Sequence, residues 1–147
     1  MEKFYWIGLV LLAGAILPIQ AGLNGKMGKV LESPEWAVLI SFLVGTITMI
    51  LYVIVMRLPI NFQKINDVPK STWIAGVLGA IYVTTVVLAF PRLGAALTFG
   101  LIVAGQLIIS LVLDHFKILV SVQHPINLPR LLGVALIVAG VIIFRRY

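Results

Sequence analysis

Residues Trp36–Met56 read WAVLISFLVGTITMILYVIVM, a run without one charged side chain that ends at Arg57. The hydrocarbon core of a bilayer is about 30 Å thick, and a helix needs roughly 20 apolar residues to cross it. Ser33 and Pro34 precede the run, and these residue types are typical of a helix N-cap and of the first helical position. The stretch therefore predicts a transmembrane helix with a defined start.

Four further apolar runs lie on either side of this one. They are Phe4–Gly22, Trp73–Phe90, Leu93–Leu113 and Leu128–Phe144. Only Arg130, in the first turn of the last run, places a charge inside any of them. That run has 14 residues between Arg130 and Arg145. They span about 21 Å at the rise of an α-helix, and outward snorkelling of both arginines would extend that length.

We therefore predict an all-α integral membrane protein with five transmembrane helices. The tryptophans agree, because Trp6, Trp36 and Trp73 each lie at the start of a run, where an aromatic belt meets the membrane surface. The whole chain, residues 1–147, is expected to form a single membrane domain. The expected helices cover approximately residues 4–24, 35–56, 72–90, 93–114 and 128–145.

The composition of the 147 residues excludes most other classes of protein. Hydrophobic residues make up 61% and charged residues 11%, and the mean hydropathy is +1.14, whereas about a quarter of a soluble domain is charged. A disordered chain and a soluble enzyme domain are thereby excluded. The net charge of +6 does not indicate a nucleic-acid partner, because the basic residues lie between the apolar runs, as membrane anchors do.

The basic residues divide almost equally between the two sides of a five-helix topology. One side carries six of them, Lys3, Arg57, Lys64, Lys70, Lys117 and Arg130. The other carries five, Lys26, Lys29, Arg92, Arg145 and Arg146. A difference of one sets no orientation by the positive-inside rule. Either other features fix the orientation, or the chain inserts both ways and pairs as two antiparallel copies.

Two amides near the end of the first run are candidates for substrate binding. Gln20 and Asn24 lie four residues apart and so share one face of a helix. Pro18 precedes them, and glycines follow at intervals of three. Polar groups are costly inside a membrane, so these amides either face a substrate or form hydrogen bonds between helices.

The fourth run carries a polar stripe and a row of small residues. Gln106, Ser110 and Asp114 recur at intervals of four and lead from mid-membrane to the interface. Gln106 is a candidate for substrate binding or for a hydrogen bond between helices, and Ser110 and Asp114 are candidates for gating or coupling. Another face holds Ala96, Gly100 and Ala104, a spacing that favours close helix packing.

The remaining candidates belong to the third run and the turn after it. Tyr82 has a ring and a hydroxyl group that could contact a substrate. Arg92 could attract an anion as a gate, although an interfacial anchor is the alternative. No catalytic or metal-binding spacing is present, since the chain has no cysteine and both histidines, His115 and His124, fall outside the spans. We expect neither an enzyme nor a cofactor.

Four short strings together resemble the short YdcZ-type family of the drug/metabolite transporter superfamily. They are Pro18–Asn24 (PIQAGLN), Ile40–Thr46 (ISFLVGT), Pro91–Ala96 (PRLGAA) and Val103–Leu107 (VAGQL), the last continuing to Leu113–Phe116 (LDHF). The resemblance covers essentially the whole chain. It implies a five-helix protein of the bacterial inner membrane that works as one half of an inverted-repeat, ten-helix transporter. It also implies a central cavity lined by the first four helices, with the fifth at the periphery.

Sequence and resemblance together predict a secondary transporter of a small organic solute or metabolite that works by alternating access. Its expected partners are the solute, the lipid bilayer and a second, antiparallel copy of the chain or a paralogue. Two alternatives stay open. One is an uncoupled channel, and the other is a membrane subunit that does not transport without a paralogous partner.

Overall fold

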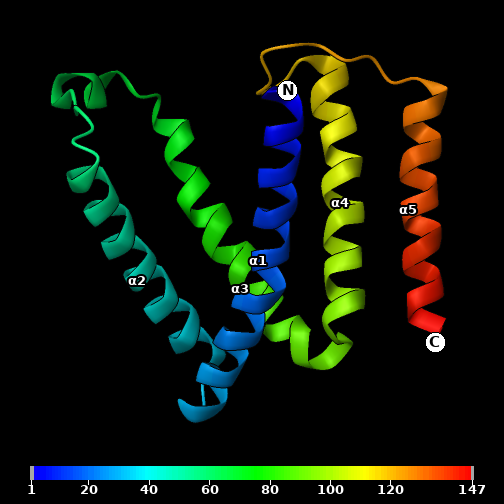
Figure 1. Cartoon of the computed structure of the whole chain (residues 1–147), viewed down its shortest axis with the longest axis horizontal. Coiled ribbons are helices and arrows are strands. Elements are labelled where there is room, and N and C mark those ends of the chain that lie inside the picture. Colours follow the sequence, from blue (N-terminus) through cyan, green and yellow to red (C-terminus); the bar gives the residue numbers. More distant parts are fainter. Residues whose placement is uncertain (1, 147) are drawn as a thin grey trace. The chain divides into compact units, whose positions relative to one another are not determined.

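The computed structural model describes residues 2–146, and no strand occurs within them. Five α-helices account for most of this range (Figure 1): α1 (Glu2–Val30), α2 (Pro34–Val55), α3 (Ile74–Leu93), α4 (Ala95–Phe116) and α5 (Leu128–Arg146). Two short 3₁₀ segments, Phe62–Asp67 and Lys70–Trp73, connect α2 to α3. Each α-helix is long and apolar enough to cross a membrane. The predicted all-α fold with five membrane-spanning helices is confirmed.

The chain divides into two compact units, one that ends at Pro91 and one that begins at Arg92. The first contains α1, α2 and nearly all of α3, and the second contains α4 and α5. Each unit is described by itself below. The expectation of a single membrane domain therefore stays a prediction.

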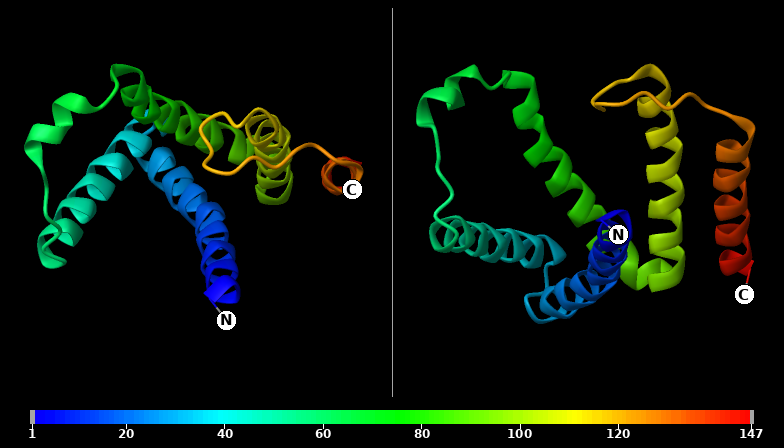
Figure 2. Two further views of the ribbon diagram at one scale, coloured as in Figure 1. Left: turned by 90° about the horizontal axis from the view of Figure 1, so that it is seen from above. Right: turned by 45° about the horizontal axis from the view of Figure 1, so that its top comes forward.

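Within the first unit, α1 and α2 meet at the turn that joins them and diverge towards their other ends (Figures 1 and 2). The predicted cap is present, since the Ser33 hydroxyl accepts a hydrogen bond from the Trp36 amide at 3.3 Å and Pro34 begins the helix. Gly28 permits the close approach, because a Cβ atom added there would lie 3.0 Å from the Cα of Pro34. The two helices are thus anchored to each other at one end only.

Helix α1 is longer than the sequence suggests, ending at Val30 rather than near residue 24. Gly25 and Gly28 do not stop it, because a glycine ends a helix only where the backbone leaves helical geometry. Helix α3 also continues further, through Pro91 and Arg92 to Leu93. The chain turns at Gly94 instead, where φ is +78°.

Within the second unit, α4 and α5 pack through the predicted row of small residues. A Cβ atom added at Gly100 would lie 3.0 Å from a methyl group of Val141, and Ala104 and Val141 are both buried. Ala96, the third member of the row, is exposed. Close packing around small side chains stabilises helix pairs in lipid, where burial of apolar surface gives no advantage.

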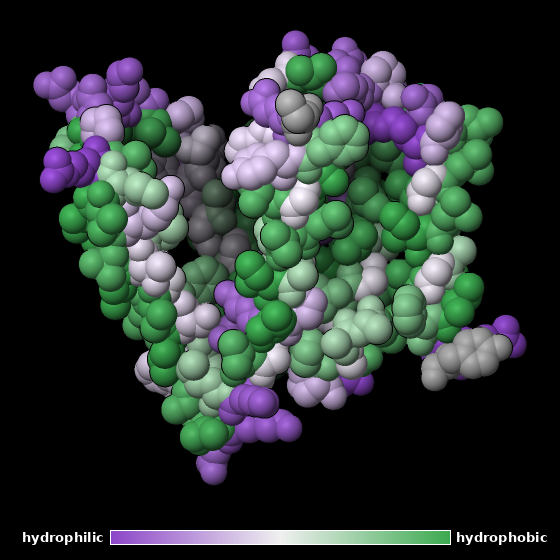
Figure 3. All heavy atoms as spheres, viewed as in Figure 1, coloured by the Kyte–Doolittle hydropathy of each residue, from purple (hydrophilic) through white to green (hydrophobic). Residues whose placement is uncertain are grey.

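Most large apolar side chains are exposed on the surfaces of the helices, and hydrophilic residues gather at helix ends and connections (Figure 3). In each helix, only between 6% and 11% of the most apolar 18-residue stretch is buried within the protein. In water such a surface would drive aggregation. In a bilayer it faces lipid, so the exposure agrees with a multi-pass membrane protein.

Candidate functional site

A groove of about 840 Å³ runs along one face of α2 in the first unit. Residues of α2 from Ser41 to Ile54 form its floor at helical spacing. Gln20 of α1 and Val83 of α3 form walls, and the chain after α2 contributes Ile60 and Phe62. Because α1 and α2 diverge from their shared turn, the groove lies in the angle between them. The space-filling view shows this opening beside α2 (Figure 3).

The polar side chains of the groove are few. Gln20 and Ser41 contribute an amide and a hydroxyl group to the lining. The Thr46 hydroxyl is already used, since it donates to the carbonyl oxygen of Phe42 at 2.8 Å. The remaining lining is apolar apart from backbone, and no charged side chain contributes to it. The groove therefore suits a molecule that is apolar over most of its surface and polar at one end.

Asn24 lies one helical turn beyond Gln20 on α1 and is only 3% exposed. Its Nδ2 atom has no hydrogen-bond partner among the described residues. A buried donor without a partner costs about 1–3 kcal/mol, so such a group requires an explanation. A hydrogen-bond acceptor brought by a ligand would satisfy this amide, although Asn24 itself does not line the groove.

The structure thus places one predicted residue, Gln20, in the lining of the groove, whereas Asn24 lies one helical turn further along α1 and does not line it. The lining also includes Ser41, which is not among the candidates that we named from the sequence. Tyr82 is half-buried on α3, but its neighbour Val83 is the α3 residue in the groove wall. Helical phase decides that difference, since adjacent residues on a helix point about 100° apart.

The other predicted residues lie in the second unit. Gln106 and Ser110 are exposed on α4, and Arg92 is exposed in the last turn of α3. A polar amide on the exposed face of a membrane helix faces lipid or a partner that covers it. The roles predicted for these three residues stay predictions.

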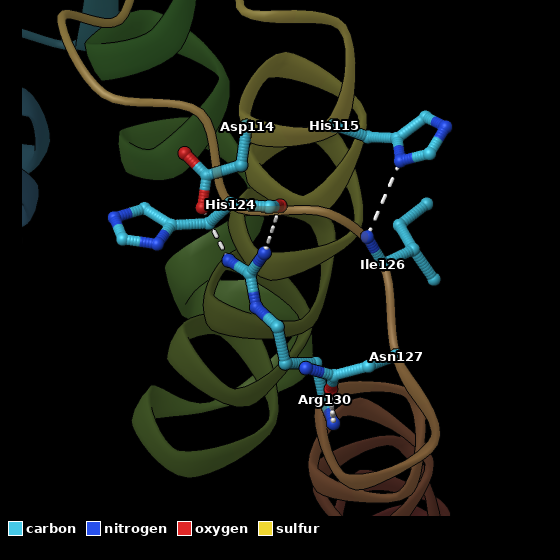
Figure 4. Close-up of polar contacts among 6 residues, drawn as sticks. All are labelled: Asp114, His115, His124, Ile126, Asn127 and Arg130. Carbon is cyan, nitrogen blue, oxygen red and sulfur yellow. Dashed lines mark hydrogen bonds and ion pairs between the residues drawn. The ribbon is translucent and has the colours of Figure 1, made fainter.

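Asp114, a candidate for gating or coupling, is held by contacts between the carboxyl end of α4 and the amino end of α5 (Figure 4). Its carboxylate forms an ion pair with the guanidinium group of Arg130. Arg130 also donates to the carbonyl oxygen of His124 at 2.5 Å, and the His124 amide donates to the carbonyl oxygen of Asp114 at 3.1 Å. These contacts fasten the α4–α5 connection and the start of α5 to the end of α4.

His115 also contributes contacts to the connection between α4 and α5. Its ring nitrogen Nδ1 accepts a hydrogen bond from the Ile126 amide at 3.2 Å, and its carbonyl oxygen accepts one from the Gln123 side chain at 2.7 Å. The ring of His124 points away from this contact (Figure 4). Within residues 2–146, no three His, Cys, Asp or Glu side chains are grouped so that they could hold a metal ion.

Comparison with known proteins now adds a family. The model of the family described as "Putative inner membrane exporter, YdcZ" matches residues 5–143 of this chain. The inner membrane protein YdcZ of Escherichia coli (strain K12) is 26% identical over 155 residues, and the match covers 99% of both proteins. No solved structure matches the chain. The family match reaches into all five helices, so the similarity concerns the whole fold.

Proposed function

Since this chain belongs to the YdcZ family of inner membrane exporters, we propose that it is a secondary transporter that moves a small organic solute by alternating access. It is a multi-pass protein of the inner membrane and of a transporter family. The observation that carries the proposal is the groove along α2, whose lining is apolar except for the side chains of Gln20, Ser41 and Thr46. Nothing in this role requires catalysis or a cofactor.

The groove supports an amphipathic or zwitterionic cargo. Its volume of about 840 Å³ falls in the range of sites for small molecules, roughly 300–1,000 Å³. Gln20 and Ser41 would bind the polar end of the cargo, with Asn24 donating to a cargo oxygen or nitrogen. A bare cation fits less well, because no carboxylate lines the groove to neutralise it.

The proposed working unit is an antiparallel homodimer. The nearly equal division of basic residues supports insertion in both orientations, and two copies supply the ten helices of an inverted-repeat transporter. A second copy would close the groove, which a single copy leaves open on one side. In such a pair Tyr82 and Gln106 would join the cavity wall, and Arg92, Ser110 and Asp114 would act as gate or coupling residues. A paralogue could take the place of the second copy.

The proposal is tested with purified protein in two steps. A library of small solutes is first screened for compounds that raise the melting temperature, since a ligand that binds only the folded state stabilises it. Each compound found is then supplied in radiolabelled form to proteoliposomes. We expect saturable uptake that Asn24→Leu abolishes and that Thr48→Val leaves unchanged. Thr48 is a suitable control because its hydroxyl donates to its own helix, at the Val44 carbonyl oxygen, and does not line the groove.

The same assay separates the alternatives. Non-saturating flux with measurable single-channel current would mean an uncoupled channel. Uptake that begins only when a paralogue is added would mean a subunit of a heteromeric pair. If no solute binds and none is transported under either condition, the transporter proposal is wrong.

A further inference from the structure

A second groove, of about 540 Å³, lies beside the carboxyl end of α1 in the first unit. One wall is a glycine face of α1, and the other is apolar and comes from Val87, Phe90 and Pro91 of α3. The two walls approach each other closely at one point, because a Cβ atom added at Gly22 would lie 3.9 Å from the Phe90 ring. This groove shares no lining residue with the groove along α2, so it is a separate site.

Charged side chains of both signs line this groove. Lys26 and Lys29 lie three residues apart on α1, and Glu32 follows two residues after the helix ends. All three are exposed, and within residues 2–146 none of them takes part in an ion pair. Two adjacent ammonium groups repel each other unless an anion lies between them. The lysines therefore favour an anion, and Glu32 favours a cation next to it.

The groove also extends from the headgroup layer of the membrane towards its hydrocarbon layer. Lysines at the end of a membrane helix extend their ammonium groups to the level of the lipid headgroups. The apolar wall begins beside them and continues along α3 towards the hydrocarbon layer, from Pro91 through Phe90 to Val87. Val87 is 2% exposed, so packing holds this wall in place. A ligand that fits both halves has a charged head and an apolar chain.

We propose that this groove binds a phospholipid whose headgroup carries a primary amine. The phosphate accepts charge-assisted hydrogen bonds from Lys26 and Lys29, and the ammonium group donates to the carboxylate of Glu32. An acyl chain lies between the glycine face and Phe90. An anionic lipid without an amine leaves Glu32 facing a negative headgroup. A quaternary amine has no N–H group to donate, so it satisfies Glu32 less well.

Gly25 provides the space for the acyl chain. No atom lies within 4 Å of a Cβ atom added there, and the residue is helical. The Cβ atom of a leucine at this position would meet no neighbouring atom, and the rest of the side chain would occupy the groove that Gly25 lines. Gly25→Leu therefore blocks the site by volume and leaves all three charges in place.

The test measures which lipids the full-length protein retains after purification. The wild type is mixed with equal amounts of a phosphatidylethanolamine, a phosphatidylglycerol and a phosphatidylcholine of identical acyl chains, and retained lipid is counted by native mass spectrometry. We expect the ethanolamine lipid to be retained about tenfold more than either of the others, the scale of one hydrogen bond between charged groups. Inorganic phosphate is added in a parallel sample, and its effect on the melting temperature is recorded.

Three variants measure separately what the two lysines, the open space at Gly25 and Glu32 contribute to lipid binding, and two further variants serve as controls. Lys26→Gln with Lys29→Gln should remove retention of all three lipids, and Gly25→Leu should do the same with the charges intact. Glu32→Gln should keep retention but equalise the ethanolamine and choline lipids. Lys64→Gln with Lys70→Gln, in the exposed connection before α3, and Gly8→Leu, at another open glycine of α1, should behave like the wild type.

Several results would overturn the proposal. Equal retention of the three lipids by the wild type would do so, as would wild-type retention by the double lysine variant or by Gly25→Leu. A Glu32→Gln variant that still prefers ethanolamine over choline would remove the assigned role of the amine. A melting temperature raised by inorganic phosphate without lipid preference would assign the lysines to a free anion instead.

Discussion

Asp114 at the end of α4 and Arg130 at the start of α5 form an ion pair across the connection between the two helices (Figure 4). The side chains are 21% and 30% exposed, respectively. The pair lies where both helices reach the same end of the unit, and the further bond from Arg130 to the His124 carbonyl group extends it into the loop. The relationship gives Asp114 a structural role whether or not it also acts in coupling.

Breaking this pair should loosen α5. We expect Asp114→Asn to lower the free energy of unfolding by about 1–3 kcal/mol, the range for hydrogen bonds that involve charged groups. The measurement is a double-mutant cycle with Arg130→Gln, read from melting temperatures in detergent. A coupling energy near zero would show that the pair contributes nothing. Arg145→Gln, exposed at the opposite end of α5, is the matched control.

The same variants separate structure from coupling. If Asp114 only fastens the helices, Asp114→Asn should leave the pH dependence of transport unchanged while it lowers the melting temperature. A proton-coupling carboxylate would instead change the pH profile of transport when it is neutralised. The two readouts are independent, so each role can be rejected without the other.

Substitution by alanine should have opposite effects on stability at Gly28 and at Gly25. A Cβ atom at Gly28 would lie 3.0 Å from the Cα of Pro34 and 3.4 Å from its nitrogen, both backbone atoms of α2 that cannot rotate away. We expect Gly28→Ala to destabilise the protein by about 1–3 kcal/mol, as overpacked sites do. Gly25 has open space, so Gly25→Ala should stabilise α1 by about 0.5–1 kcal/mol through helix propensity. Equal melting temperatures for the two variants would contradict the packing of α1 on α2.

Gly94 should not tolerate alanine. Its φ of +78° and ψ of +165° lie in a region that only glycine adopts readily. The Thr98 hydroxyl donates to its carbonyl oxygen at 2.7 Å, which fixes this conformation at the start of α4. We expect Gly94→Ala to cost about 1–3 kcal/mol, measured as a lower melting temperature. Gly105→Ala, at an open position within α4, should not lower it.

The sequence could predict the helices because a long uncharged run that crosses a bilayer must satisfy every backbone polar group internally. An α-helix does this within a single segment. It could not predict where α1 ends, since glycine spacing does not reveal which glycines keep helical geometry. Gly28 continues α1, whereas Gly94 interrupts helical geometry between α3 and α4. That difference lies in the backbone conformation, which is helical at Gly28 and has a positive φ at Gly94, and the spacing of glycines does not reveal it.

The candidate site was predictable in part for a similar reason. Intervals of four place Gln20 and Asn24 on one face of a helix, and of the two only Gln20 lines the α2 groove. No interval links Asp114 to Arg130, because their contact depends on the path of the intervening loop. Nor could the sequence show that Val83 rather than Tyr82 lines the groove, because that depends on the rotation of α3 about its axis.

Replacement of Asn24 by an apolar residue should stabilise the protein. The buried Nδ2 atom of Asn24 has no partner among the described residues, so Asn24→Leu, which keeps the number and branching of the side-chain heavy atoms, should raise the unfolding free energy by about 1–3 kcal/mol. The measurement is the melting temperature of the ligand-free protein. Asn24→Asp, which buries a charge at the same place, should lower it. A drop with leucine would mean that the amide contributes to the fold, and the case for a ligand contact at Asn24 would be lost.

Dual insertion predicts that each end of the chain is accessible from both sides of the membrane. The chain has no cysteine, so Lys3→Cys and Arg146→Cys each introduce a single reporter. In sealed cells, an impermeant maleimide should label about half of each variant, and the rest should react only after the membrane is opened. Adding three lysines to the connection between α2 and α3 should bias that division, since short loops rich in lysine stay on the cytoplasmic side. Complete labelling of one terminus and none of the other would show a single orientation and exclude the antiparallel homodimer.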